Sequence, residues 1–201
     1  MSDAAVLKKL DIVATIKDGI AIGMKNIGPI LVNVLLYLVT VWIPYLNVGT
    51  TIGLVIGIVS KASRGEAISF TEIFDSKYRK YMGEFFLAGG LVYMGILAGM
   101  CLFIIPGIVI AIAWSLALLL VVDKGKNPIE AITLSNNCTY GNKARIFGVN
   151  FILFLVYCIA VGIFSLIPIL GMILILAVVI IYCFAFIGLQ ASIYKQLTEN
   201  I

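Results

Sequence analysis

The stretch that decides the fold covers residues 146–194 and reads IFGVNFILFLVYCIAVGIFSLIPILGMILILAVVIIYCFAFIGLQASIY. These 49 residues contain no charged side chain. As one helix they would extend about 74 Å, whereas the hydrocarbon core of a bilayer is about 30 Å thick. Two membrane-spanning helices fit this length. The Ile167-Pro168 pair, followed by Gly171, predicts the turn that joins them.

Two further charge-free blocks, residues 26–60 and 85–122, repeat this pattern. Each contains one Ile-Pro pair, and the three prolines, Pro44, Pro106 and Pro168, are spaced 62 residues apart. Proline removes a backbone donor and clashes with the preceding turn, so it interrupts a helix. The sequence therefore predicts three helical hairpins with these prolines at their apices.

The predicted arms of the hairpins are residues 27–43, 45–60, 85–105, 107–122, 146–167 and 169–189. Six transmembrane helices are the preferred interpretation. The arms after Pro44 and Pro106 are short, about 24 Å each, and full crossing by such arms requires local thinning of the bilayer. Re-entrant hairpins are the alternative, and they would require protein or water to cover the apex.

The composition places the chain in a membrane. Its 201 residues are 62% hydrophobic and 12% charged, with a mean hydropathy of +1.14 and no histidine. Soluble domains carry about 25% charged residues, so a soluble enzyme, a nucleic-acid binder and a disulfide scaffold are all excluded. The absence of histidine removes the commonest general base and transition-metal ligand. We expect no catalytic residue, no cofactor and no metal.

The charges predict the topology. All 14 Lys/Arg and 10 Asp/Glu, which give a net charge of +4, lie outside the three blocks. Two crossings per block bring every charged segment to one face, which the preference of Lys and Arg for short cytoplasmic loops assigns to the cytoplasm. The expectation is a multi-pass protein of the plasma (inner) membrane with both termini cytoplasmic.

A polar segment precedes each hairpin, which divides the chain into three internal repeats of one membrane domain, residues 1–62, 63–124 and 125–201. Each polar segment is predicted to form an interfacial helix. The first has an apolar stripe, formed by Val6, Leu10, Val13, Ile16, Ile20 and Met24. A capping box of Ser69 and Glu72 begins the second, and Asn127 with Pro128 begins the third, which Gly141 can end. We expect the first helix to lie along the membrane; ordinary packing on the bundle is the equal alternative.

Three groups of residues are candidates for particular roles. Small residues allow helices in lipid to approach closely, and Gly49, Gly53, Gly57, Gly95 and Gly99 form such strips, although a glycine strip can also line a pore or an oligomer contact. Asn33 and Asn150 lie inside apolar arms, where they form either interhelical hydrogen bonds or a polar path for a solute. The candidates for contact with anionic headgroups are Lys77, Arg79, Lys80, Lys143 and Arg145.

Few side chains in the sequence are of the kinds that would indicate transport or catalysis. Coupled carriers place ionisable residues inside the bundle, and here only Glu84 stands at the mouth of an arm. The four cysteines form no C-x-x-C pair and are expected to pack as small residues, with Cys138 as a free thiol. A catalytic site would have to use a carboxylate such as Glu84 or Asp123.

Four short motifs resemble a prokaryotic family of six-helix membrane proteins, related to the membrane domain attached to some glycerophosphodiester phosphodiesterases. They are Ser69-Phe70-Thr71-Glu72-Ile73-Phe74, Ile104-Ile105-Pro106-Gly107-Ile108, Pro128-Ile129-Glu130-Ala131-Ile132 with Ser135 and Gly141, and Ile167-Pro168-Ile169-Leu170-Gly171 with residues 191–194. The chain departs from such families at Asn136, where an aromatic residue is common. The resemblance implies the fold and a plasma-membrane location, and it brings no catalytic residues.

The functional expectation is a non-enzymatic membrane protein that acts by helix packing, assembly or docking with other membrane components. Its expected partners are the lipid bilayer and either a second copy of the chain or another membrane protein, with no nucleic acid. The alternative is a channel or passive transporter for a small solute, with its path between the hairpins. A lipid-modifying activity is the third hypothesis.

Overall fold

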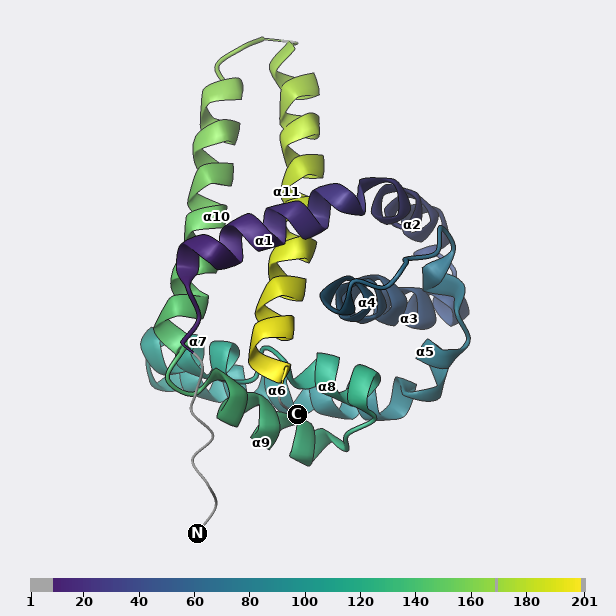
Figure 1. Ribbon diagram of the computed structural model, residues 1–201, viewed down its shortest axis with the longest axis vertical. Helices are drawn as coiled ribbons and strands as arrows, with labels where there is room; N and C mark the ends of the chain where they lie inside the picture. Colours follow the sequence, from purple (N-terminus) through teal and green to yellow (C-terminus); the bar gives the residue numbers. More distant parts are fainter. Residues whose placement is uncertain (1–8, 169, 200–201) are drawn as a thin grey trace.

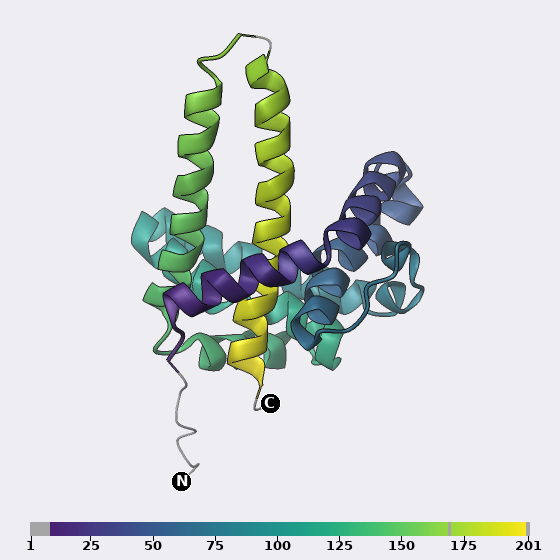
Figure 2. The ribbon, with the colours of Figure 1, turned by 45° about the horizontal axis from the view of Figure 1, so that its top comes forward.

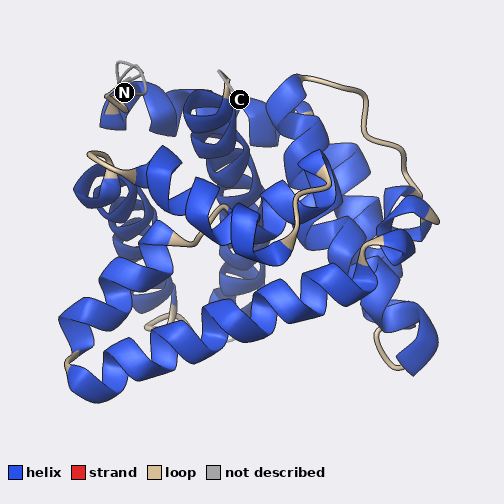
Figure 3. Cartoon of the chain, turned by 90° about the horizontal axis from the view of Figure 1, so that it is seen from below, coloured by secondary structure: helices blue, strands red, loops and turns tan. Residues whose placement is uncertain are grey.

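The computed structural model describes residues 9–168 and 170–199, and this part of the chain consists of helices and their connections without a strand (Figures 1 and 3). The helices are α1 (Ile12–Lys25), α2 (Ile27–Thr40), α3 (Pro44–Ile52), the π-helix η1 (Gly53–Gly57), α4 (Ile58–Arg64), the 3₁₀-helix η2 (Glu72–Phe74), α5 (Lys77–Lys80), α6 (Met82–Leu102), α7 (Ile104–Ala113), α8 (Ala117–Lys124), α9 (Pro128–Thr139), α10 (Lys143–Phe164) and α11 (Leu170–Thr198).

Several helical segments are long and apolar enough to cross a membrane. They are Pro44–Arg64, which joins α3, η1 and α4, Met82–Leu102, Ile104–Lys124, Lys143–Phe164 and Leu170–Thr198. The expected first arm is α2, which satisfies the same criterion only together with α1, and the two helices are bent by 72° at their junction. By length and composition, the described chain therefore offers five spans, or six if the bent pair counts as one.

The proline positions mark the junctions that the sequence predicts. Pro44 is the first residue of α3, and Pro168 lies between α10 and α11. Between α6 and α7 the extended residue Phe103 (φ −162°) breaks the helix, and Pro106 lies in the first turn of α7, where its missing N–H is tolerated. A fourth proline, Pro29, lies in the first turn of α2 and helps to separate it from α1.

The hairpins point in different directions. In Figure 1, α10 and α11 rise side by side, whereas α6 and α7 run across the base of the molecule. Figure 2 shows α1 lying across this tall hairpin and the upper part of the hairpin standing clear of the other helices. The structure thus contains several long apolar helices, and they are not arranged as a parallel six-helix bundle.

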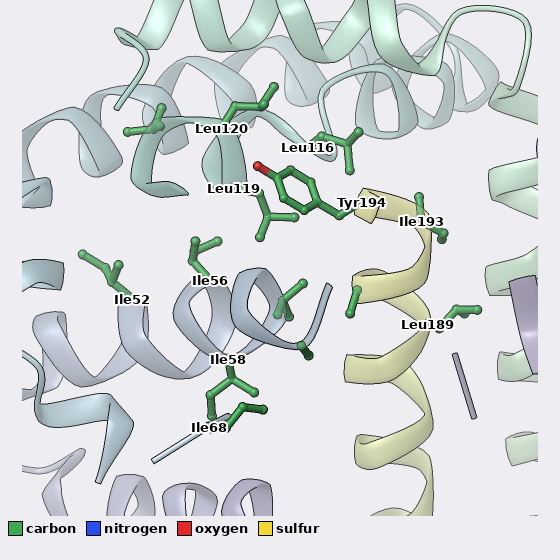
Figure 4. Close-up of a cluster of buried hydrophobic side chains, with 14 of the residues drawn as sticks. Ile52, Ile56, Ile58, Ile68, Leu116, Leu119, Leu120, Leu189, Ile193 and Tyr194 are labelled. Atoms are coloured by element: carbon green, nitrogen blue, oxygen red, sulfur yellow. The ribbon is translucent and has the colours of Figure 1, made fainter. Parts of the chain in front are cut away.

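The core lies where the charged ends of the hairpins meet. Figure 4 shows side chains from three places converging there: Ile52, Ile56 and Ile58 from the α3–α4 segment, Leu116, Leu119 and Leu120 from α8 and the residue before it, and Leu189, Ile193 and Tyr194 from the end of α11. Tyr194 is 2% exposed, although it lies in the last turns of its helix. We call this region the hub.

The first predicted interfacial helix forms as α1, and it packs on α11 through a face of small residues. Asp11 caps α1 by accepting a hydrogen bond from the Ala14 N–H at 2.9 Å, and Val6 lies outside the described residues. The face of α1 that packs on α11 carries Thr15, Gly19 and Gly23, whereas Val13, Ile20 and Met24 of the apolar stripe are exposed. Of the same stripe, Leu10 is buried and Ile16 is half-buried against the core, so the stripe is divided between the interior and the surface.

The second segment does not form the single helix that was predicted, whereas the third segment does form a helix. Residues 69–81 form η2 and the four-residue α5, separated by the extended residue Asp75. In the third, Asn127 accepts a hydrogen bond from the Glu130 N–H at 2.9 Å, Pro128 begins α9, and Gly141 adopts φ +76° after its end.

Candidate functional site

A buried carboxylate organises the segment between α4 and α6. Glu72 is 2% exposed, and its side chain accepts hydrogen bonds from Tyr78 Oη at 2.6 Å, Lys61 Nζ at 2.8 Å and Lys77 Nζ at 3.1 Å. It also accepts a weak bond from the Ser69 N–H at 3.3 Å, as the predicted capping box requires. One carboxylate thus fixes both turns of this segment to α4.

The environment of Glu72 sets the protonation of this cluster. Burial opposes the charge and by itself raises the pKa of the Glu72 carboxyl, but hydrogen bonds from Lys61, Tyr78 and Lys77 outweigh it. The net pKa lies below the usual value, so Glu72 stays ionised at neutral pH. Burial, together with the hydrogen bond to Glu72, raises the pKa of Tyr78, so its hydroxyl stays protonated and donates.

Asn33, a candidate for the polar path, holds the same segment from the other side. Its Nδ2 donates to the carbonyls of Ser69 at 2.7 Å and Pro29 at 2.8 Å, and its Oδ1 accepts from the Ile73 N–H at 3.1 Å. The side chain is 0% exposed. These bonds explain why residues 69–73 turn rather than continue as a helix.

A second buried carboxylate, Asp123, lies at the hub. It accepts a hydrogen bond from Tyr194 Oη at 2.7 Å and forms an ion pair with Arg64, and its side chain is 7% exposed. Arg64 also pairs with Glu66 through Nε at 2.5 Å. The ends of α4, α8 and α11 are therefore joined by one polar network, which Asp123 centres.

The Ser135 side chain replaces backbone hydrogen bonds that are lost between α7 and α8. Between α7 and α8 the chain leaves helical geometry, and the Ser135 hydroxyl on α9 donates to the Ala113 carbonyl at 2.8 Å while accepting from the Leu116 N–H at 3.1 Å. Thr139 donates to the same carbonyl at 3.2 Å. Both side chains are 0% exposed, so α9 supplies hydrogen bonds that the break removes from the helix.

Asn150, the second candidate for the polar path, is bonded elsewhere. Its Oδ1 accepts from Gln190 Nε2 at 2.8 Å and its Nδ2 donates to the Ile146 carbonyl at 2.9 Å, so it joins α10 to α11. Asn33 and Asn150 therefore serve different contacts, and no hydrogen bond links them within residues 9–168 and 170–199.

The predicted glycine strips are packed mostly by side chains, by the backbone of Ile73 at Gly53, and by another glycine at one point. A Cβ on Gly57 would meet the Tyr78 ring at 2.2 Å, and one on Gly95 would meet the Trp114 ring at 2.1 Å. Gly53 lies under Ile73, Gly49 lies under Arg79, and Gly99 alone faces another glycine, Gly107. The strips accommodate the residues around Glu72 and the return helix α7.

Sequence reasoning missed the closest helix crossing, which joins α1 to α11. A Cβ on Gly188 would lie 2.0 Å from the Gly19 carbonyl oxygen, and one on Gly23 would lie 2.4 Å from that of Phe184. The spacing of Gly19 and Gly23, which places both on one helix face, indicates such a close helix contact. Ser192 reinforces the crossing by donating to Asp18 at 2.9 Å.

Most of the predicted headgroup cations already have partners inside the protein. Lys77 pairs with Glu72 and with Asp75 at 3.0 Å, and Lys143 donates to Asn136 at 3.0 Å. Arg145 donates to the Leu10 carbonyl at 3.0 Å, Arg79 packs on Gly49, and Lys80 lies 5.7 Å from the centre of the Tyr81 ring.

The remaining candidates lie apart from one another. Glu84 is exposed in the first turn of α6, whereas Asp123 is paired at the hub. Cys101, Cys158 and Cys183 are exposed, and burial raises the pKa of Cys138 to about 11. Among the described residues, no three His, Cys, Asp or Glu side chains gather as metal ligands.

A cleft of about 530 Å³ lies between the α1–α2 junction, the end of α4 and α11. Its charged lining residues are Lys25, Arg64, Glu66 and Lys195. Comparison with known proteins adds nothing to this geometry, since the chain matches no protein-family model, no curated protein and no solved structure.

Proposed function

We propose that this protein is a six-span plasma-membrane protein with cytoplasmic termini that acts by assembling with other membrane components, not by catalysis. The observation that carries the proposal is the use of its polar groups. Glu72, Asp123, Asn33, Asn150 and Ser135 all serve contacts within the fold, and no buried side-chain nitrogen or oxygen in the described chain lacks a partner. What the molecule presents to its surroundings along the hairpins is apolar surface.

The α10–α11 hairpin is the surface that we assign to assembly. Only 11% of the most apolar stretch of α10 and of α11 is buried, as in α6, against 61% for the Pro44–Arg64 segment. Tyr157 and Tyr182 pack together on it with ring centroids 4.5 Å apart, and neither hydroxyl has a hydrogen-bond partner in the described chain. Hydroxyl groups in a bilayer require partners, because water is absent there.

A second copy of this chain is the partner that fits this surface. In a two-fold symmetric contact the same patch meets itself, so each tyrosine pair would find hydroxyls in the opposite pair. Tyrosine is also enriched at the centre of protein interfaces, where its ring packs and its hydroxyl bonds. The alternative, a solute path lined by Asn33 and Asn150, is less favoured because both amides are engaged in the fold.

Native cysteines provide the test. Cys158 on α10 and Cys183 on α11 are exposed on the hairpin, and Cys101 at the end of α6 is an exposed control on another hairpin. Single-cysteine variants in native membranes would be treated with a short bifunctional maleimide. We expect a dimer-sized product with Cys158 or Cys183 and little with Cys101. Only monomer in all three, or equal yields that include Cys101, would overturn the proposed assembly.

The channel hypothesis has its own measurement. Liposomes that contain the intact protein would be compared with empty liposomes and with liposomes that contain Asn33→Leu or Asn150→Leu. The assembly proposal expects no flux of small solutes above that of empty liposomes. Flux that the intact protein supports and that either variant abolishes would favour the channel instead.

A further inference from the structure

The cleft beside the α1–α2 junction has the size of a small-molecule site. Its volume of about 530 Å³ lies within the range of about 300–1,000 Å³ that ligand pockets occupy. One wall is the junction of α1 and α2 with Lys25 and Asn26, another is the turn after α4 from Arg64 to Ile68, and Lys195 of α11 closes it. Three segments that are far apart in the sequence thus build one concave surface.

The charge of this lining is positive. Arg64, Lys25 and Lys195 face a single acidic lining residue, Glu66. Arg64 is engaged by Glu66 and Asp123, but Lys25 and Lys195 have no ion pair among residues 9–168 and 170–199. Two cations with unneutralised charge therefore border the cleft, in contrast to Lys77, whose charge two carboxylates neutralise.

Unused backbone donors lie in the same place. Gly65 adopts φ +70°, and its N–H and that of Glu66 bond back to α4. The next two residues, Ala67 and Ile68, also line the cleft, and their N–H groups donate no hydrogen bond within the described chain. Successive free N–H groups beside lysines are a combination that binds anions such as phosphate.

We propose that this cleft binds a phosphate group. Lys25 and Lys195 supply its countercharge, and the N–H groups of Ala67 and Ile68 donate to its oxygens. Ile22 and Pro29 provide an apolar wall for the carbon portion of a phosphate ester. The phosphate can belong to a lipid headgroup, since α1 exposes Ile20 and Met24 one turn away, or to a soluble ester. This site is independent of the assembly proposed for the hairpin.

Two probes and one matched pair of variants test the site. Purified full-length protein in phosphatidylcholine nanodiscs would be titrated with glycerol 3-phosphate, and native mass spectrometry would compare retained phosphatidylglycerol with phosphatidylcholine. Lys25→Gln/Lys195→Gln removes two charges from the cleft. Lys17→Gln/Lys124→Gln removes two charges from exposed lysines outside it. Circular dichroism would verify that both variants are folded.

We expect the cleft variant to bind at least one probe about tenfold more weakly than the wild type, with the control variant unchanged. Selective retention of phosphatidylglycerol assigns the site to a lipid headgroup, whereas binding of glycerol 3-phosphate alone assigns it to a soluble ester. The proposal is overturned if the wild type prefers neither probe, or if both variants lose affinity equally, since diffuse surface charge would then explain the binding.

Discussion

At the scale of single residues, the Ser135 hydroxyl forms hydrogen bonds that a helix backbone normally forms itself. The turn between α7 and α8 deprives the Ala113 carbonyl and the Leu116 N–H of helical partners. The Ser135 hydroxyl bonds to both, and Thr139 adds a second hydrogen bond to the carbonyl. Asn33 has the same role for residues 69–73. In both cases a short polar side chain from a neighbouring helix allows the chain to leave helical geometry inside an apolar core.

Replacing Ser135 should therefore be costly. Ser135→Ala leaves two buried backbone groups with fewer partners, and we expect it to lower the free energy of unfolding by about 2 kcal/mol. The measurement is the thermal unfolding midpoint of purified protein in detergent. Thr133→Ala on the exposed face of the same helix, where the hydroxyl bonds only to the Ile129 carbonyl, is the control. Equal thermal unfolding midpoints for the two variants would argue against a stabilising role for these Ser135 hydrogen bonds.

Glu72 predicts a dependence of stability on pH. Because its pKa is lowered in the folded protein, its stabilisation is complete above the usual value of 4.5 and is lost as the pH falls through the lower folded pKa. We expect Glu72→Gln to destabilise the protein by about 2 kcal/mol at pH 7. The difference from the wild type should shrink at pH values below 4.5, as measured by unfolding midpoints. The exposed Glu130→Gln should show no such convergence, and a constant difference for Glu72→Gln would refute the assignment.

The residues of this site could be predicted only in part. The capping box identified Glu72, and the position of Asn33 in an apolar arm marked it as a hydrogen-bonding residue. The lysines that surround Glu72 could not be assigned, because Lys61 approaches from a helix on the other side of a turn. Ser135 appeared in a motif without a role, since the break it repairs lies 22 residues away in sequence at Ala113.

At the scale of elements, the crossing of α1 over α11 holds the N-terminal helix to the tall hairpin. The two backbones approach so closely at Gly19 and Gly188 that no side chain fits between them. Val13 and Met24 of the apolar stripe remain exposed beside this contact, which suits a helix that lies at a membrane surface.

Gly188→Ala should loosen this crossing. The added methyl would overlap the Gly19 carbonyl, and we expect a loss of about 2 kcal/mol in unfolding free energy. Limited trypsin digestion should then cleave faster at the lysines of α1. Gly162→Ala on α10, where a Cβ meets nothing within 4 Å, is the matched control. Unchanged digestion of Gly188→Ala would contradict the close approach.

The hairpins were predictable because their signals are local. Uninterrupted apolar sequence and proline set the helices and their junctions, and Asn127 with Gly141 set the limits of α9. Residues 69–81 were mispredicted as one helix because their conformation depends on Asn33, a residue distant in sequence. The contact of α1 with α11 was missed, because it is made at Gly19 and Gly23, outside the apolar stripe that the sequence pattern emphasised.

At the scale of the whole molecule, the two buried carboxylates, Glu72 and Asp123, both pair with basic residues of α4, and the hairpin apices lie at the far ends of apolar helices. Leu166 is 82% exposed at the apex between α10 and α11, and Phe103 is 77% exposed between α6 and α7. In Figure 1, α6 and α7 run across the direction of α10, whereas helices that all cross a membrane would be expected to run roughly parallel. The Phe103 apex is therefore the informative position.

The most direct test is cysteine accessibility in intact cells with a membrane-impermeant maleimide. In a background with the four native cysteines replaced, single cysteines would be placed at Phe103 and Leu166 and, as cytoplasmic references, at Lys17 and Lys124. The account predicts that both apices label from outside and that both lysine positions label only after permeabilisation. Protection of Phe103 with labelling of Leu166 would make α6–α7 re-entrant, and external labelling of Lys17 or Lys124 would contradict a one-sided charged hub.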